Sequence, residues 1–304
     1  MSVVLTRPGK AELILENPVM AAAGILGDGS GYRSMINLKK LGALVTNPVS
    51  YYPRKPAQGV RTVPLDSGVL VNTGLPNAGV SVTIKHMRNR WEALGIPVIL
   101  HLIATSTDEV AKAMKIIDTV DVIAGVELGL PDDISAQDAA DLTDAAVRRA
   151  EKPVIVRLPL YDAYEIATSV ADAGAGALVV AAPPRGVARE PVSGQLVTGQ
   201  IYSRTTHAMC LRLVTRLLQR VQNVPIIGAG GIHTQQDARD YIEAGTVAVQ
   251  VDSVTWVLPR MIEIIARDLG GMVLTRESGA LADEWFTGIG KTDVMQRRRD
   301  PYDD

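Results

Sequence analysis

The 304-residue sequence has a single cysteine, one phenylalanine and an aromatic content of only 4%. With Cys210 alone, an intramolecular disulfide is excluded, and its place in an apolar helical stripe predicts a core residue. Residues 1–10 contain no basic segment followed by an apolar run, so we expect a cytoplasmic protein. No uninterrupted apolar run of about 18 residues exists, which argues against a membrane span.

The chain also has little excess charge and no cluster of metal-ligand spacing. Its 31 Lys and Arg residues nearly balance 33 Asp and Glu residues, so we expect no nucleic-acid partner. His, Cys, Asp and Glu residues show no spacing typical of metal ligands, and we predict no metal site. What is abundant is glycine, at 27 residues, which predicts tight turns or close backbone approach to a ligand.

Short apolar runs alternate with longer amphipathic segments along the whole chain. The predicted strands are Val19–Ala23, Ala43–Asn47, Pro97–Leu102, Val120–Leu128, Pro153–Leu158, Ala177–Ala181, Val224–Gly228 and Thr246–Asp252. The predicted helices that follow them are Tyr32–Leu41, Val80–Leu94, Thr107–Ile117, Ala136–Ala150, Tyr161–Ala173, Thr205–Gln222, Thr234–Glu243 and Trp256–Leu269. Ser106, Ser135 and Thr234 stand where they can cap helix N-termini.

The strands are continuous apolar runs, so both of their faces are predicted to be buried, as in a parallel sheet. Eight such units predict an α/β protein with a single TIM (β/α)8 barrel domain over residues 1–304. A doubly wound open sheet is the competing architecture, but its glycine-rich turn would follow the first strand rather than the seventh.

Two units are longer than the others and predict extended loops after strands 2 and 6. The first, Pro48–Gly79, is expected to cover part of the barrel mouth. The second, Ala182–Arg204, is too rich in proline and glycine for a helix and suits a lid or an interaction loop. Residues 271–304 are predicted to form a C-terminal extension, whose Arg-rich end is interpreted as a frayed terminus.

Few titratable side chains stand at the predicted strand ends. The small residues of Gly228–Ile232 would let backbone N–H groups approach a phosphate, although a purely structural turn is the alternative interpretation. Arg157 is either a cation beneath a flat ring or the ion-pair partner of Glu127 on the neighbouring strand. His101 and Tyr161 are candidates for a proton donor or acceptor, and no catalytic residue is assigned.

Four segments, each in its own β/α unit, match one known pattern. They are Glu16–Gly24 in the first strand, Asn72–Gly79 with its Asn-x-x-Gly-Leu-x-Asn-x-Gly spacing, Ile226–Ile232 followed by Asp237-Ala238, and Val249–Val251. Together they resemble the dihydroorotate dehydrogenase family, and particularly its soluble class. These proteins are FMN-binding TIM barrels of pyrimidine synthesis.

The resemblance implies an FMN-dependent oxidoreductase. Hydride would pass between flavin N5 and a carbon of a small conjugated substrate, dihydroorotate/orotate or a relative. The implied cofactor contacts are Ala22, Ala23, Gly24, Thr46, Asn47, Arg157, Gly199, Gly230, Gly231, Asp252 and Ser253. The implied substrate contacts are Asn72, Leu75 and Asn77. A homodimer and an electron-transfer partner subunit are also implied.

Departures from the family pattern gather at the reacting centre. Where the soluble class has Glu-Leu-Asn and then Cys-Pro-Asn, this chain has Glu127-Leu128-Gly129 and Leu130-Pro131-Asp132. A leucine thus stands at the position of the proton-abstracting cysteine. The other departures are Asn47 and Arg157 for two lysines, Ala181-Ala182-Pro183 for a substrate asparagine, and Asp252 for a glycine beside the phosphate.

Because of these departures, two alternatives stay open. One is a non-flavin barrel enzyme, such as an isomerase or lyase, that binds a phosphorylated metabolite. The other is a catalytically degenerate barrel that serves as a scaffold or regulatory subunit.

Overall fold

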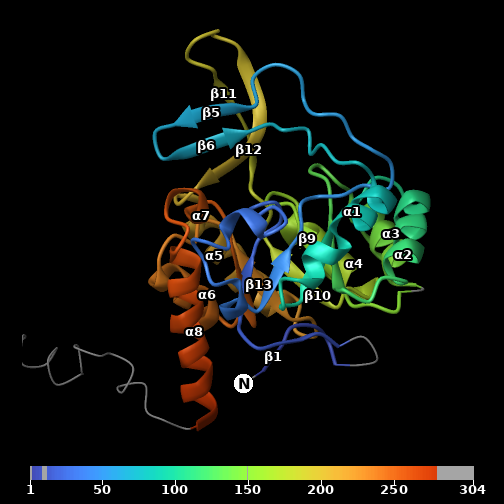
Figure 1. Ribbon diagram of the computed structural model, residues 1–304, viewed down its shortest axis with the longest axis vertical. Helices are drawn as coiled ribbons and strands as arrows, with labels where there is room; N and C mark the ends of the chain where they lie inside the picture. The colour runs from blue at the N-terminus through green and yellow to red at the C-terminus, as the bar shows by residue number, and fades with distance from the viewer. Residues whose placement is uncertain (1, 9–11, 149, 279–304) are drawn as a thin grey trace, which may run out of the picture.

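The computed structural model describes residues 2–8, 12–148 and 150–278, and within them eight parallel strands close into a barrel (Figure 1). In chain order they are β3 (Val19–Ala21), β4 (Ala43–Val45), β7 (Val98–Ile103), β8 (Ile123–Gly129), β9 (Val154–Leu158), β10 (Ala177–Val180), β13 (Ile226–Ala229) and β14 (Ala248–Val251). Parallel pairing of β14 with β3 closes the ring. The predicted TIM barrel is confirmed.

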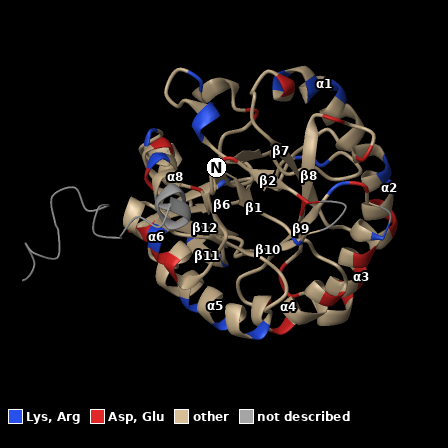
Figure 2. Ribbon diagram, turned by 90° about the horizontal axis from the view of Figure 1, so that it is seen from below, with Lys and Arg blue, Asp and Glu red and all other residues tan. Residues whose placement is uncertain are grey.

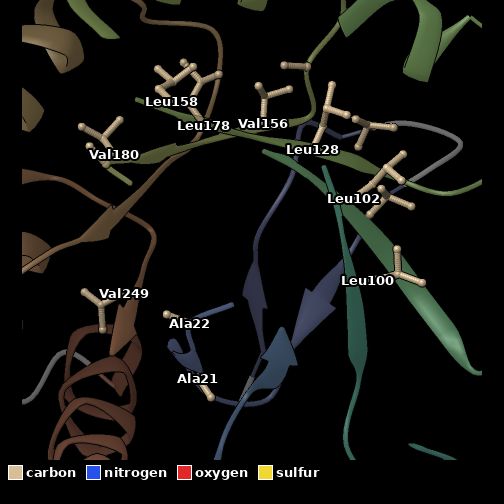
Figure 3. Close-up of a cluster of buried hydrophobic side chains, with 14 of the residues drawn as sticks. Ala21, Ala22, Leu100, Leu102, Leu128, Val156, Leu158, Leu178, Val180 and Val249 are labelled. Carbon is tan, nitrogen blue, oxygen red and sulfur yellow. The ribbon is translucent and has the colours of Figure 1, made fainter. Parts of the chain in front are cut away.

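Every strand of the barrel is buried on both faces, which explains the continuous apolar runs. Inward-facing residues such as Ile99, Ile155 and Ile227 fill the barrel interior. Outward-facing residues such as Leu100 and Val156 pack beneath the helices, and Figure 3 shows this outer layer.

The floor of the barrel is closed by a short antiparallel hairpin that the sequence did not predict. It consists of β1 (Val3–Val4) and β2 (Ile14–Leu15). In Figure 2, which views the molecule from below, the hairpin lies across the barrel opening that faces the reader. Leu5, Leu13 and Leu15 join the interior cluster from this side. Because the N-terminal ends of the strands are plugged, the opposite end is the place for a ligand.

A ring of helices surrounds the strands, with charged residues on its outer faces (Figure 2). The helices are α1 (Val80–Glu92), α2 (Thr107–Ile117), α3 (Ala136–Val147), α4 (Ala163–Asp172), α5 (Thr206–Arg220), α6 (Gln235–Ala244), α7 (Val254–Val257) and α8 (Met261–Ser278). The three predicted caps are confirmed: the side chains of Ser106, Ser135 and Thr234 each accept a backbone N–H of the first turn. No helix in the described ranges has the length and apolar character needed to cross a bilayer.

Two of the predicted helices are wrong in part. Residues 32–41 do not form an α-helix but lie in and between two 3₁₀ turns, η1 (Ser30–Tyr32) and η2 (Leu38–Lys40). Asn37 caps the second turn and so starts a new element inside the predicted one. The predicted helix 256–269 is divided into α7 and α8, because Pro259 cannot donate an N–H to a continuous helix.

The two extended loops after barrel strands 2 and 6 are confirmed, and they pair with each other. One contributes β5 (Thr62–Leu65) and β6 (Gly68–Val71), and the other contributes β11 (Arg185–Arg189) and β12 (Leu196–Ser203). Antiparallel pairing in the order β11-β12-β6-β5 builds a sheet above the barrel mouth (Figure 1). We call this four-stranded unit the upper sheet. The sequence predicted neither its strands nor their pairing.

The predicted C-terminal extension begins inside a helix. The last helix, α8, runs to Ser278, so residues 271–278 continue it. Residues 279–304, including the Arg-rich end, lie outside the described part of the chain.

Candidate functional site

Four polar side chains from four barrel strands meet in the barrel interior below the mouth. Nδ1 of His101 lies 2.7 Å from Oε1 of Glu127, and Nη1 of Arg157 lies 3.5 Å from the same oxygen. Arg157 also donates to Oε1 of Gln250 at 2.8 Å, while Nε2 of Gln250 donates to Oε2 of Glu127. We call these four residues the barrel cluster.

The barrel cluster holds an ionised carboxylate in the core. Glu127 is completely buried. Burial alone raises the pKa of a carboxyl group, but the hydrogen bond from His101, the charge of Arg157 and the hydrogen bond from Gln250 hold the pKa of Glu127 at about 2. The ion pair that the sequence suggested between Arg157 and Glu127 is therefore present.

Sequence reasoning missed Gln250 as a member of this cluster. The available signal was an amide flanked by valines in an otherwise apolar strand. A fully buried amide must find hydrogen-bond partners, so its isolation in the sequence already pointed to a polar contact inside the barrel.

The imidazole of His101 occupies space beside Gly129 at the end of β8. A Cβ added to Gly129 would lie 2.5 Å from Nε2 and 2.7 Å from Cε1 of His101. Real Cβ atoms do not come that close to ring atoms, so any larger residue at 129 would displace the ring. The glycine that replaces a family asparagine is thus required by the histidine on the neighbouring strand.

The glycine-rich turn after β13 packs against the start of α5. A Cβ on Gly231 would lie 2.4 Å from the backbone nitrogen of His207, and one on Gly230 would lie 2.6 Å from Sγ of Cys210. Both glycines have positive φ, +105° and +67° for residues 230 and 231. Their N–H groups make no hydrogen bond within the described residues. The turn therefore needs glycine for packing and also leaves backbone donors for an anion.

Asp252 directly follows β14, so its carboxyl group lies at the same end of the barrel as the glycine-rich turn after β13. Its Oδ1 accepts hydrogen bonds from the backbone N–H and the hydroxyl of Ser253, at 2.5 and 3.2 Å. Burial raises the pKa of Asp252 despite these hydrogen bonds and the charge of Arg157. The backbone N–H of Ser253 thus already donates to the side chain of Asp252.

The ends of β3 and β4 bring five of the predicted cofactor positions together. The N–H of Gly24 donates to the carbonyl oxygen of Thr46 at 3.1 Å, and Ala22 donates to the last residue of β14. Ala22 and Thr46 are buried, Ala23 and Gly24 are half-buried, and Asn47 is exposed. A surface of small residues therefore faces the mouth from this side.

The predicted substrate loop is held in shape by Asn77 itself. Oδ1 of Asn77 accepts the N–H groups of Gly79 and Ser50, and Nδ2 donates to the carbonyl oxygen of Leu75 at 3.1 Å. Leu75 has a positive φ of +51°, so the loop is tightly bent there. Both ends of the Asn77 amide are engaged within the loop, whereas the side chain of Asn72 makes no hydrogen bond in the described structure and is half-buried.

Gly199 lies within β12 of the upper sheet. A Cβ there would meet the carbonyl oxygen of Val71 at 2.6 Å and Cδ2 of Leu70 at 2.7 Å, so close packing against β6 accounts for this glycine. Gly231 packs against a segment that follows β12 in the sequence: a Cβ added to Gly231 would lie 2.8 Å from the carbonyl oxygen of Arg204.

Other candidate groups lie outside the barrel cluster. Tyr161 is 67% exposed. Leu130 is buried, and Asp132 forms an ion pair with Arg185 of β11 at 3.3 Å, which links the β8 loop to the upper sheet. Tyr202 of β12 packs on Trp256 with ring centroids 4.9 Å apart, and burial raises the pKa of Tyr202 to about 12.

No group of three or more His, Cys, Asp or Glu side chains suited to a metal ion occurs within the described residues. Two surface cavities, of about 480 and 380 Å³, lie away from the strand ends. One is between α2 and α3, and the other is beside η2.

Comparisons with known proteins agree with the geometry of the barrel. A family model described as dihydroorotate dehydrogenase matches residues 10–272. Similar proteins named "Dihydroorotate dehydrogenase B (NAD(+)), catalytic subunit" occur in Pelobacter propionicus, 31% identical over 85% of this chain and 90% of the relative, and in Desulforudis audaxviator, 32% identical over 88% and 92%. A third, from Geobacter metallireducens, is 29% identical over 94% of both chains. Because the family match covers most of the sequence, the protein belongs to the dihydroorotate dehydrogenase family.

Proposed function

We propose that the protein is an FMN-dependent oxidoreductase of the dihydroorotate dehydrogenase type, acting on a CH–CH bond of a small conjugated substrate. The observation that carries this proposal is the turn after β13. There the backbone N–H groups of Gly230 and Gly231 lie beside the start of α5 and make no hydrogen bond to any described residue. A helix start and successive backbone donors are suited to a phosphate.

The remaining predicted contacts divide into those that suit a flavin and one that opposes its phosphate. Ala22, Ala23, Gly24, Thr46 and Asn47 offer small or hydrogen-bonding groups to a flat ring, and Gly199 and Ser253 remain proposed phosphate contacts. The opposing residue is Asp252, because an ionised carboxylate repels a phosphate. Burial raises the pKa of Asp252, so protonation removes that repulsion at a higher pH than it would for an exposed aspartate. Bound FMN would supply a two-electron acceptor for hydride.

The chain's own residues would then orient the substrate and shield it from water. Arg157 provides a permanent cation near the ring, where it can stabilise an electron-rich reduced flavin. Asn72, Leu75 and Asn77 belong to the loop proposed to contact the substrate, and the side-chain amide of Asn72 makes no hydrogen bond to a described residue. The upper sheet lies above the barrel mouth (Figure 1) and would exclude solvent from the reacting bond.

The names of the relatives extend the proposal to a partner. Those proteins are named as catalytic subunits of an NAD(+)-linked enzyme. By analogy, we propose a small-molecule substrate, a homodimer of this chain and an electron-transfer partner subunit, in the cytoplasm. Strands β11 and β12 of the upper sheet expose Val187 and Leu196, by 60% and 64%, and these side chains make residues 182–204 a proposed lid or interaction surface.

The test is spectroscopic. Purified protein should be yellow, show a flavin absorption spectrum and release FMN on heating, and dihydroorotate added without oxygen should bleach the flavin. Colourless protein that cannot be reconstituted with FMN would refute the proposal. Bound flavin that dihydroorotate does not bleach would instead exclude that substrate. The phosphorylated-metabolite and scaffold interpretations are less well supported, because the family match spans the whole barrel.

A further inference from the structure

We propose that His101 is the proton acceptor of this site and that Glu127 orients it. The inference rests on the proposed function, because oxidation of a CH–CH unit removes a proton as well as a hydride. The electron pair of one C–H bond leaves with the hydride to the flavin. The electron pair of the other C–H bond forms the new C=C bond while its proton passes to a base. Leu130, at the position of the family's cysteine, cannot be that base.

The imidazole of His101 has one nitrogen engaged and the other open. Nδ1 lies 2.7 Å from a carboxylate oxygen of Glu127, so in the neutral ring Nδ1 carries the hydrogen and Nε2 carries the lone pair. Nε2 makes no hydrogen bond within the described residues. The His101 side chain is 9% exposed. Among the described residues, the side-chain polar atom that is fully buried without a partner is Oγ1 of Thr246, so Nε2 of His101 is not such an atom.

Gly129 explains why a histidine can stand at this position. With no side chain at 129, Nε2 fills the space 2.5 Å from where its Cβ would be. The resemblance puts one of the family's hydrogen-bonding asparagines at 129. A polar group is therefore still present at this level of the barrel mouth, but it comes from β7 instead of β8, and it is a group that can accept a proton.

The rest of the barrel cluster suits this role. The charged and titratable groups that face His101 or its partners are Glu127 from β8, Arg157 from β9, Asp252 from the end of β14 and Tyr202 from β12. Glu127 is held ionised by hydrogen bonds and by Arg157, so it can stabilise the imidazolium that forms when Nε2 takes a proton. An orienting carboxylate behind a histidine is the arrangement of an acid–base pair.

The first test replaces His101 by glutamine in the flavin-loaded protein. The glutamine amide can still donate to Glu127 but cannot take a proton, so we expect H101Q to keep its flavin and to lose about 100-fold or more in the rate of anaerobic bleaching by dihydroorotate. The matched control is H86Q, on the exposed face of α1, with an unchanged rate. H101Q that bleaches at the wild-type rate would overturn the proposal while leaving the proposed function intact.

The second test does not depend on turnover. In protein labelled with ¹⁵N-histidine, four imidazoles contribute signals, and H101Q identifies the one from His101. We expect the neutral form of that ring to be the Nδ1–H tautomer and its signal to shift when orotate is added. We also expect G129A to disturb the signal through the clash at Nε2. An Nε2–H tautomer, or a signal that orotate does not change, would contradict the assignment. Absence of flavin from wild-type protein would count against the proposed function itself.

Discussion

Replacing Glu127 by glutamine should destabilise the whole barrel, because it removes the negative charge on which the barrel cluster is built. Arg157 would remain buried, at 6% exposure, and no described residue would offer it a counter-charge within hydrogen-bonding range. Breaking a buried ion pair by removing one partner costs about 3–5 kcal/mol. The shift of the Glu127 pKa from 4.5 to about 2 corresponds independently to about 3 kcal/mol of stability at neutral pH.

The pH dependence of this loss has a defined sign. The folded-state pKa of Glu127 lies below the value of 4.5 for a free side chain, so its stabilising effect is complete above pH 4.5 and is lost as the pH falls toward 2. The difference in unfolding free energy between wild type and E127Q should therefore be about 3 kcal/mol at pH 7 and should shrink steadily below pH 4.5.

Urea unfolding followed by circular dichroism at a series of pH values measures this difference. The control is D108N, which breaks the exposed pair of Asp108 with Lys112 on α2 and should cost less than about 1 kcal/mol. E127Q that is as stable as wild type at pH 7, or a loss that is the same at pH 7 and pH 3, would refute the account of the cluster as an ionised and mutually stabilising set.

Three further predictions concern other parts of the molecule. G199A should loosen the upper sheet, since a methyl group there meets β6 at 2.6 Å; limited proteolysis within 182–204 should be faster than in the exposed control T198A, and equal rates would contradict the packing. D252N should bind FMN more tightly than wild type at pH 8, and wild-type affinity should rise as the pH falls, because burial raises the pKa of Asp252 and protonation removes its charge; flavin fluorescence titration measures both, and equal affinity of the two proteins at pH 8 would disprove the repulsion. Cys210 should resist iodoacetamide at pH 8 in the folded protein and react in urea, because burial raises the pKa of its thiol to about 12; labelling detected by mass spectrometry before unfolding would show that the thiol is accessible.

The sequence predicted the barrel well because its signals are local. Runs such as Val154–Leu158 are apolar at nearly every position, and only strands buried on both faces tolerate this pattern. The helix starts at Ser106, Ser135 and Thr234 were predicted equally well, because a cap depends on residues within one helical turn. Two helix predictions failed because a nearby residue interrupted the helix. Asn37 began a new turn inside one predicted helix, and Pro259 divided another.

Only part of the candidate site could be predicted from the sequence. The turn at Gly230–Gly231 could be found because backbone approach to an anion requires consecutive small residues. The partnership of His101 with Gly129 could not be found, because the two residues belong to different strands and meet only through the register of β7 with β8. In the sequence, Gly129 was a departure from the family pattern and His101 was a separate candidate for proton transfer.

The amino-acid sequence by itself thus determined the number and order of the β/α units, the burial of the strands and the family to which the chain belongs, since hydrophobic periodicity and short motifs act over a few residues. Only the tertiary structure decided that the two long loops pair into one sheet and that Glu127 joins His101, Arg157 and Gln250 in one cluster. Those contacts depend on closure of the barrel, which brings β14 and β7–β9 around a common interior although they are far apart along the chain.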